Sequence, residues 1–220
     1  MHGDQATGEQ VNGQWPPCLF LVFGNARHGD EDAPARWYME VHGPDAFKSP
    51  AFSALHRYQA IGDYDARYLA VWECSFCSLA DARSQIVPRS ARLRDKSRIS
   101  DDLIVVWSSM NFLTGEPAST DPGPVDPVQA ATVTLIEGGY FQEPAATTYR
   151  YGGVVLYESP SAPASVARAW SDRGKEGIAP HGPYRNIFDH PETWPPAGEA
   201  AADPWISHWR PIGSLRRDDG

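Results

Sequence analysis

The sequence predicts an α+β fold in which helices pack on an antiparallel sheet. Short apolar or alternating runs typical of strands are separated by amphipathic segments typical of helices. The chain has 220 residues, of which 41% are hydrophobic and 21% are charged, the composition of an ordinary globular protein. That length allows one large domain or two small ones, with enough residues for a core.

The first half of the chain reads as strand, helix, strand, strand, helix, strand. Its first strand is the apolar run Cys18–Gly24, which predicts a position inside the sheet with both faces buried. The first helix is expected to begin near Asp32 and to end at His42, because Gly43 and Pro44 are typical of a helix stop. The other expected elements are strands at Phe52–Gln59, Arg67–Cys74 and Asp102–Phe112, and a helix from Leu79 to about Val87 that Pro88 breaks or ends. This order defines a ferredoxin-like unit.

The second half repeats that series only in part, so we expect a degenerate second ferredoxin-like unit. Its expected elements are strands at Ala131–Gly139 and Gly153–Glu158, a helix at Ala164–Arg173, short strands at Tyr184–Phe188 and Trp205–Arg210, and an inserted loop or lid at Pro191–Pro204. The expected organisation is a disordered lead-in at residues 1–17, the first unit at 18–113, a Pro-rich linker at 114–128, the second unit at 129–212 and a tail at 213–220.

Charge and hydropathy argue against two classes of partner. The formal net charge is −9, and the only basic concentration, Arg89–Arg98, is typical of a solvated helix face, so we expect no nucleic-acid partner. No apolar run approaches the ~20 residues of a membrane span, so we expect no membrane association. The polar N-terminus lacks the hydrophobic region of a signal peptide, which indicates a cytoplasmic protein.

The three cysteines do not form the framework of a secreted disulfide-rich domain. Cys74 and Cys77 have the spacing of a redox motif, but the strand before them is expected to be internal, and nothing else indicates a thioredoxin fold. We therefore expect buried free thiols. No Cys or His pair has the spacing of a metal site, so we expect no metal.

Residues 18–112 carry a recognisable pattern. After an apolar strand come W-Y-x-x-x-H-x-P-D at Trp37–Asp45, a strand that carries Arg57 and Tyr58, and the run R-Y-L-A-V-W-E at Arg67–Glu73. This part of the chain resembles the dimeric α+β barrel superfamily, and especially its EthD-like branch. The resemblance implies that two ferredoxin-like units form an eight-stranded barrel, either across a homodimer or within one chain.

Members of that superfamily include cofactor-free monooxygenases, polyketide cyclases, dehydratases, isomerases and haem-binding enzymes. The resemblance therefore implies an enzyme of bacterial secondary or catabolic metabolism without fixing its reaction. The chain departs from the superfamily at Pro88, where the second helix often continues uninterrupted, and in its second half, where the W-Y-x-x-x-H motif does not recur.

His42 is the strongest catalytic candidate, because an imidazole titrates near neutral pH and can move a proton. At a helix end the dipole would favour its protonated form, which suits a general acid, and the alternative is a histidine that only caps the helix. Tyr38 lies four residues earlier and could donate a phenol hydrogen bond to substrate. Arg57 could stabilise a carboxylate or enolate if it faces the barrel, and otherwise is a surface charge.

Five further residues are candidate substrate contacts, each with core packing or surface exposure as its alternative reading. Tyr58 and Trp72 could line one cavity from neighbouring strands, and His208 could reach the barrel from the second half. Asp45 could orient His42 or cap the loop. The full set of candidate substrate-binding residues is Trp37, Asp45, Tyr58, Trp72 and His208.

These residues indicate a cofactor-independent lyase of the dehydratase or cyclase type. The expected substrate is a small aromatic or polyketide-like molecule in the barrel cavity, and a homodimer is possible within the superfamily. One alternative is a monooxygenase on the same fold, either cofactor-free or haem-dependent, although the sequence has no haem-attachment motif. The other alternative is a non-catalytic binding or assembly module whose cavity is a filled core.

Overall fold

The computed structural model describes most of the first half of the chain and parts of the second. The described residues are 16–27, 32–112, 130–137, 148–151, 154–159, 165, 175–176 and 205–217. Several expected features lie outside them: the lead-in up to residue 15, the linker at 114–128, the helix at 164–173 apart from residue 165, the strand at 184–188 and the inserted loop at 191–204.

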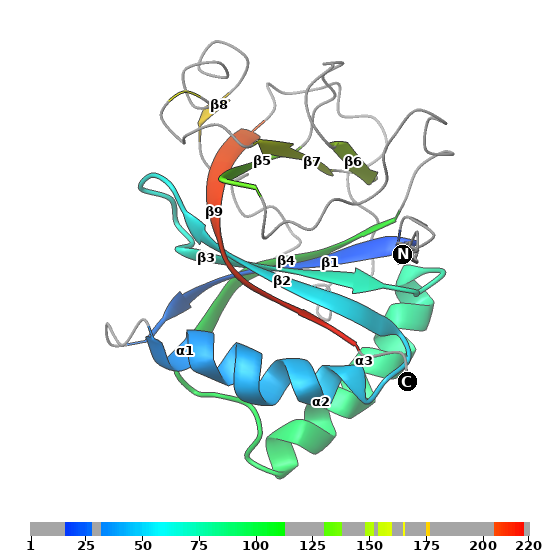
Figure 1. The fold of residues 1–220 in the computed structure, drawn as a ribbon. Coiled ribbons are helices and arrows are strands. Elements are labelled where there is room, and N and C mark those ends of the chain that lie inside the picture. Colours follow the sequence, from blue (N-terminus) through cyan, green and yellow to red (C-terminus); the bar gives the residue numbers. More distant parts are fainter. Residues whose placement is uncertain are drawn as a thin grey trace, which may run out of the picture.

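The first half forms an antiparallel sheet with the ferredoxin-like order β4-β1-β3-β2 (Figure 1). Its strands are β1 (Cys18–Ala26), β2 (Phe52–Ala60), β3 (Tyr68–Cys74) and β4 (Leu103–Phe112). Because β1 pairs with both β3 and β4, the prediction of an internal first strand is confirmed. The predicted hairpin of β2 and β3 is confirmed as well.

The second half supplies the strands β5 (Thr132–Glu137), β6 (Thr148–Tyr151), β7 (Val154–Ser159), β8 (Lys175–Glu176) and β9 (Trp205–Arg216). Without the two-residue β8, the strands β5, β6, β7 and β9 are the first to fourth strands of the second unit. Their spatial order, β9-β5-β7-β6, is then fourth, first, third and second, the same as the order β4-β1-β3-β2 of the first unit. A second ferredoxin-like unit is thereby confirmed at the level of strand order. Sequence reasoning missed β6, although the Gly-Gly pair between β6 and β7 is a hairpin signal.

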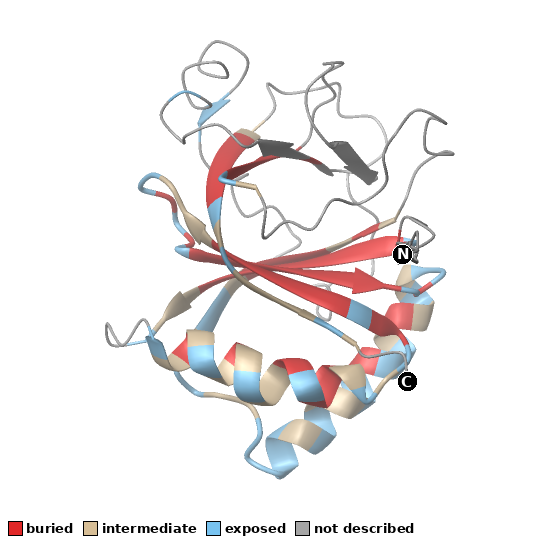
Figure 2. Cartoon of the chain, viewed as in Figure 1, coloured by how far each residue is buried: buried red, intermediate tan, exposed pale blue. Residues whose placement is uncertain are grey.

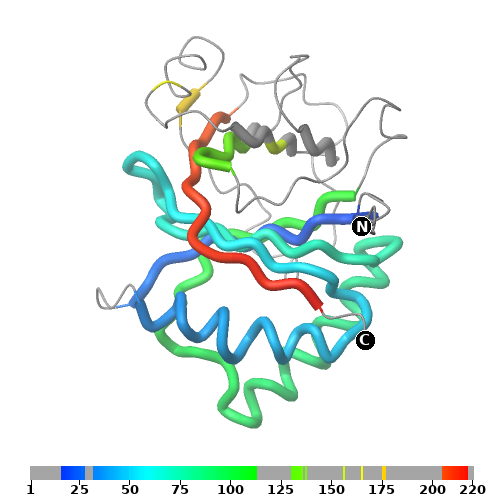
Figure 3. The backbone as a smooth tube through the Cα atoms, viewed as in Figure 1, coloured from blue at the N-terminus to red at the C-terminus, as the bar shows by residue number. Residues whose placement is uncertain are grey.

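One long strand connects the two units. The first part of β9 pairs with β5, and the later part pairs with β2, where Ala54 lies opposite Arg216. Figure 3 traces this strand in red from the second unit down along β2 to the C-terminus. The expectation of a tail from residue 213 is therefore wrong, because Gly213 to Arg216 belong to the sheet. The backbone of β2 needs this partner for its outer hydrogen bonds.

The sheet of the first unit has a hydrophobic cluster on each face. Side chains that alternate along β1 divide between them, with Leu21 and Phe23 on one face and Phe20 and Val22 on the other. The first cluster also contains residues of β5, β7 and β9 and so lies between the two units. The second cluster packs against the helices, which cover the opposite face (Figure 1). Figure 2 shows the strands of this central sheet as the most continuously buried part of the chain.

The first helical segment is longer than predicted. It runs through α1 (Asp32–Trp37), the π-helical turn η1 (Tyr38–His42) and α2 (Gly43–Phe47) without a break. The expected stop at His42 is wrong, because Pro44 falls in the first turn of α2, where a missing N–H costs little. The Gly43 N–H donates to the carbonyl oxygen of Tyr38, five residues earlier, which closes the wide turn.

The second helix is also longer than predicted. Ser78 caps α3 (Leu79–Asp95) by accepting a hydrogen bond from the Asp81 N–H, as is typical of a serine at this position. The expected end near Val87 is wrong. Pro88 is exposed, so water can bind the carbonyl that loses its donor. Among the described residues, no helix is long and apolar enough to cross a membrane.

Candidate functional site

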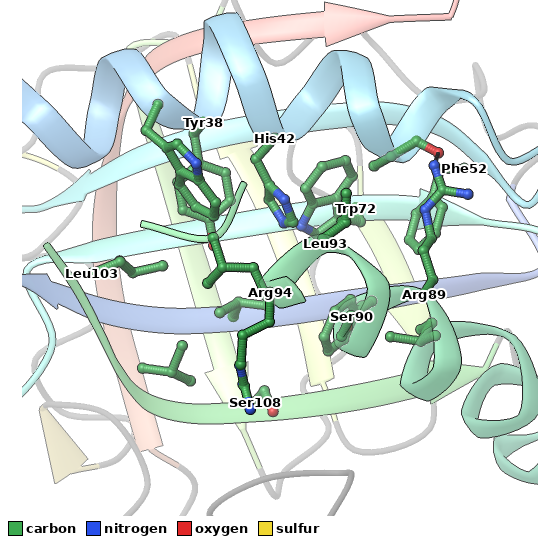
Figure 4. Close-up of a pocket in the computed structure, with 17 residues that line it drawn as sticks. Tyr38, His42, Phe52, Trp72, Arg89, Ser90, Leu93, Arg94, Leu103 and Ser108 are labelled. Carbon is green, nitrogen blue, oxygen red and sulfur yellow. Dashed lines mark hydrogen bonds between the residues drawn. The ribbon is translucent and has the colours of Figure 1, made fainter. Parts of the chain in front are cut away.

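A pocket of about 250 Å³ lies between the helices and the first unit's sheet (Figure 4). Its aromatic walls come from β1, the first helical segment, β2 and β3, and its polar groups come from η1, α3 and β4. The aromatic lining residues are Phe20, Trp37, Tyr38, Phe52 and Trp72, and the polar ones are His42, Arg89, Ser90, Arg94 and Ser108. The pocket can therefore hold a flat apolar molecule with a few polar groups.

The pocket lies on the helix side of the sheet. The expectation of a site in the barrel cavity, between the two units, is wrong for the pocket that contains His42. The physical reason is the alternation of the strands, which directs Phe20, Val22 and Trp72 toward the helices and the intervening side chains toward the second unit.

The π-helical turn brings the ring of His42 onto the ring of Trp37. Their centroids are 4.4 Å apart, and the ring planes are inclined by only 11°. Residues five apart diverge around an α-helix, but the wider π turn brings them onto one face. The edges of Tyr38 and Trp72 meet the same imidazole, with centroids 5.2 Å and 5.4 Å away. His42 is thus held by aromatic rings from the helix and the sheet.

His42 is neutral at physiological pH. Burial, and then the nearby positive charge of Arg57, lower its pKa to about 4, while Asp45 acts in the opposite direction. Its Nδ1 atom is buried and has no hydrogen-bond partner. The expectation of a protonated acid held by the helix dipole is therefore wrong, because the helix continues past His42 and desolvation dominates. A neutral imidazole can accept a proton.

Arg57 lies behind the pocket wall rather than in it. It is 2% exposed, and its guanidinium carbon lies 3.8 Å from the centroid of the Tyr38 ring. A second ring, that of Tyr68, lies 5.9 Å away. Burial lowers the pKa of Arg57, and no ion pair links it to a carboxylate among the described residues. The expectation of a surface charge is wrong, and so is that of a side chain facing the barrel.

A bulge explains why Arg57 and Phe52 share the helix face. The alternation expected along this strand places Phe52 with Tyr58, but the register shifts between Phe52 and Ala54. Phe52 therefore joins Leu55 in the cluster under the helices, whereas Tyr58 packs between the two units. Tyr58 and Trp72 consequently lie on opposite faces and do not share a cavity.

Two other candidates lie away from the pocket. Asp45 is buried and accepts hydrogen bonds from Lys48 Nζ at 2.7 Å and Arg98 Nε at 2.8 Å, and these bonds lower its pKa to about 2. It ties α2 to the segment after α3 and neither orients His42 nor caps a loop. His208 is buried on β9, where its Nδ1 is 3.0 Å from Thr134 Oγ1. It does not line the pocket.

The polar residues that α3 contributes are the part of the site that sequence reasoning missed. The basic run at Arg89 reads as a solvated face, yet Arg89 lines the pocket and its Nη2 donates to the backbone carbonyls of Asp45 and Ala46. The available signal was helical spacing, because Ile86, Arg89 and Leu93 fall on one stripe once the helix passes Pro88.

The cysteines are free, as predicted, but only in part buried. Cys18 and Cys74 face each other across β1 and β3, and burial raises the pKa of the Cys74 thiol well above its usual value. Cys77 is exposed, which corrects the expectation of a buried pair. Within the described residues, no group of His, Cys, Asp or Glu side chains is arranged to hold a metal ion.

One comparison with a solved structure supports this fold. No protein-family model matches the sequence, and no curated protein matches it either. Among solved structures, the chain is similar to the protein described as "Crystal structure study of anthrone oxidase-like protein", with a TM-score of 0.50, 11% identity and coverage of 95% of this chain and 97% of the other. A dye-decolorizing peroxidase from Bacteroides thetaiotaomicron is similar at a TM-score of 0.44 and 7% identity, with coverage of 92% and 95%.

The fold and the site together define an α+β protein of two ferredoxin-like units, with an aromatic pocket under the helices of the first unit. The resemblance to the α+β barrel proteins is confirmed for the fold. Assignment to the EthD-like branch stays a prediction.

Proposed function

We propose that the protein is an enzyme that removes a proton from the carbon next to a carbonyl group, with neutral His42 as the base. The observation that carries the proposal is the placement of a neutral imidazole, fixed between aromatic rings, in the wall of a pocket of about 250 Å³. The pocket beside His42 is open, whereas a filled core at this place would have favoured a non-catalytic binding or assembly module.

The leading reaction is a dehydration or cyclising dehydration of a small aromatic or polyketide-like molecule. His42 takes the α-proton, and the electron pair of the C–H bond forms an enolate. The enolate then reforms the carbonyl and expels a hydroxyl group from the β-carbon. The imidazolium returns its proton to that leaving group, so that one water is released and His42 is neutral again. No external oxidant or reductant is needed.

Positive charge around the pocket supports an enolate intermediate. Arg89 lines the pocket, and Arg57 lies directly behind the Tyr38 ring. Both lower the pKa of His42, while Asp45 raises it by less than Arg57 lowers it and by more than Arg89 does. A field that disfavours a cation at His42 favours an anion in the same place. Arg57 therefore stabilises the enolate from behind the Tyr38 ring. Tyr38 is the candidate donor of a phenol hydrogen bond to the enolate oxygen.

A cofactor-free oxygenase is the second candidate, and it shares the first step. The likeness to a protein described as anthrone oxidase-like favours it at the level of fold. In that reaction the substrate carbanion would react with molecular oxygen. A haem-dependent version does not fit the pocket, because about 250 Å³ lies below the ~300–1,000 Å³ of common ligand sites and suits a small fused-ring molecule instead of a macrocycle.

Three probes separate these possibilities. β-Tetralone in deuterium oxide reports α-proton exchange, β-hydroxy-α-tetralone reports dehydration to α-naphthol, and anthrone reports oxygen uptake to anthraquinone. The leading proposal predicts exchange and naphthol formation that His42→Gln abolishes, with an unchanged rate for the exposed control variant Arg67→Met. Oxygen uptake with anthrone but no naphthol would support the oxygenase. Exchange that survives in His42→Gln would contradict both.

A further inference from the structure

Buried donors without partners gather around the pocket. Among the described residues, the buried side-chain nitrogen and oxygen atoms that lack a hydrogen-bond partner include His42 Nδ1, Arg57 Nε and Nη1, and Arg89 Nε. His42 and Arg89 line the pocket, and Arg57 contacts its wall through Tyr38. Unpartnered buried donors destabilise a folded protein, so a cluster of them indicates groups that a ligand satisfies.

Arg57 is the most demanding member of this cluster. Its guanidinium is buried in a region of low polarity, without a carboxylate among the described residues, and burial of an unpaired cation costs several kcal/mol. The Tyr38 ring covers the flat face of the guanidinium, which compensates in part. Its Nε and Nη1 atoms are both without a partner, and each can donate a charge-assisted hydrogen bond to a carboxylate oxygen.

A small cavity lies at Arg57 and adjoins the pocket. Arg57, Gly24, Tyr68 and Ala70 line only this cavity, whereas Val22, Tyr38 and Leu103 line both it and the pocket. The side chains of Tyr38 and Leu103 thus separate the two spaces. In the present arrangement the small cavity has no room for a water molecule, so an anion reaches Arg57 only when one of these two side chains turns aside.

We propose that the pocket takes aromatic carboxylic acids, whose carboxylate pairs with the guanidinium of Arg57 while the ring lies between Trp72 and the helices. This proposal takes from the proposed function only the assignment of this pocket as the substrate site, because it concerns binding and not turnover. No Asp or Glu lines the pocket, so nothing there repels an anion.

The contact between a bound carboxylate and Arg57 also couples ligand binding to the pKa of His42. Among the charges, Arg57 has the largest effect and lowers the pKa of His42, Asp45 raises it, and Arg89 lowers it by less. A carboxylate beside Arg57 offsets the larger of the two positive fields, so the pKa of His42 rises when the acid binds. His42 then becomes a stronger base only when a carboxylate-bearing substrate is present.

The experiment compares two ligands with the same ring system and different charge. Binding of β-naphthoate and β-naphthamide is measured at about pH 7 by tryptophan fluorescence, since Trp37 and Trp72 line the pocket. We expect β-naphthoate to bind at least ~10-fold more tightly, the effect of one charge-assisted hydrogen-bonded pair. Equal affinities, or no binding of β-naphthoate, would overturn the proposal.

Two variants test the geometry of the contact. Arg57→Met removes the charge but keeps an apolar side chain of similar length, and we expect it to abolish the preference for β-naphthoate. Arg57→Lys keeps the charge without the planar edge, and we expect it to lose most of the preference. Full preference in Arg57→Lys would overturn the contact with the guanidinium, as would any preference retained in Arg57→Met. The exposed Arg67→Met variant matches the change in net charge and should bind like the original protein.

The proposed proton transfer by His42 and the proposed carboxylate site at Arg57 can each fail while the other holds. Naphthoate binding requires no chemistry, and a thermal unfolding curve of each variant shows that it is folded. β-Tetralone, the probe for proton exchange, has no carboxylate. A protein that exchanges the tetralone proton but shows no preference for naphthoate keeps its proposed function and loses the carboxylate site.

Discussion

The imidazole of His42 lies flat on the indole of Trp37, with 4.4 Å between ring centroids. The contact exists because the turn between them is π-helical, with the Gly43 N–H bonded five residues back. Trp37 is in turn fixed by its own hydrogen bond, from Nε1 to the carbonyl oxygen of Arg98 at 3.0 Å. A base held in this way presents one orientation to the pocket, which is what proton transfer requires.

Acid destabilises the protein through His42. The pKa of this histidine is lowered from 6.5 to about 4 on folding, so the unfolded chain binds a proton between these values and the folded chain does not. Stability therefore falls as the pH falls from 6.5 to about 4, by at most about 3 kcal/mol. Denaturant unfolding at several pH values in this range measures the slope.

His42→Phe is the matched variant for that slope. Phenylalanine keeps a ring against Trp37 but does not titrate, so stability should depend less on pH between 6.5 and 4. His208, whose pKa is also lowered by burial, adds a slope of the same sign to both proteins. Asp45 loses its contribution below its usual pKa of 3.8, outside this window. Identical slopes in the two proteins would contradict a buried neutral His42.

Arg57 depresses the pKa of His42 through its charge, after the larger effect of burial. Arg57→Met should therefore raise the pKa of His42 part of the way toward 6.5 without restoring it. The measurement is a proton NMR titration of the His42 imidazole. Replacing a buried unpaired cation by an apolar side chain leaves stability similar or higher. A pKa of His42 that stays the same in Arg57→Met would show that the two groups are not coupled.

Gly43 packs against Leu215 of β9 without room for a side chain. A Cβ atom added there would lie 2.6 Å from Leu215 Cδ1 and 2.9 Å from the carbonyl oxygen of Tyr38. Gly43→Ala should destabilise the protein by roughly 1–3 kcal/mol, since the backbone contact cannot yield. Equilibrium unfolding in urea measures the change.

A second variant separates the two contacts of that added methyl group. Leu215→Ala removes the nearer atom. Gly43→Ala should therefore lower the free energy of unfolding by less in a Leu215→Ala background than in the original protein. A fully additive double variant would show that Leu215 does not restrict this position.

The strands of the first unit could be predicted because each is a clear apolar or alternating run. The helices could not be bounded in the same way. Gly43 and Pro44 are a stop signal in most chains, but here a π turn shifts the phase so that Pro44 starts a new helical turn. Pro88 is tolerated because it is exposed. Both outcomes depend on tertiary packing, which a local signal does not contain.

Only part of the site could be predicted, again because local sequence signals do not contain tertiary packing. The sequence indicated Trp37, Tyr38, His42 and Trp72, which the structure brings to one pocket. It could not indicate that a bulge in β2 places Arg57 under Tyr38, because bulges leave no periodic signal. The neutral state of His42 also escaped prediction, since it depends on burial among rings from the helix and from β3. The roles of these residues stay predictions.

The central claim is that His42 takes a proton from carbon in this pocket. The most direct measurement is the rate at which β-tetralone exchanges its α-protons in deuterium oxide, followed by NMR with the original protein and His42→Gln at about pH 7. The account predicts enzyme-dependent exchange that falls by at least ~100-fold in His42→Gln, the usual contribution of a general base. Exchange at the same rate in both proteins, with both folded, would contradict it.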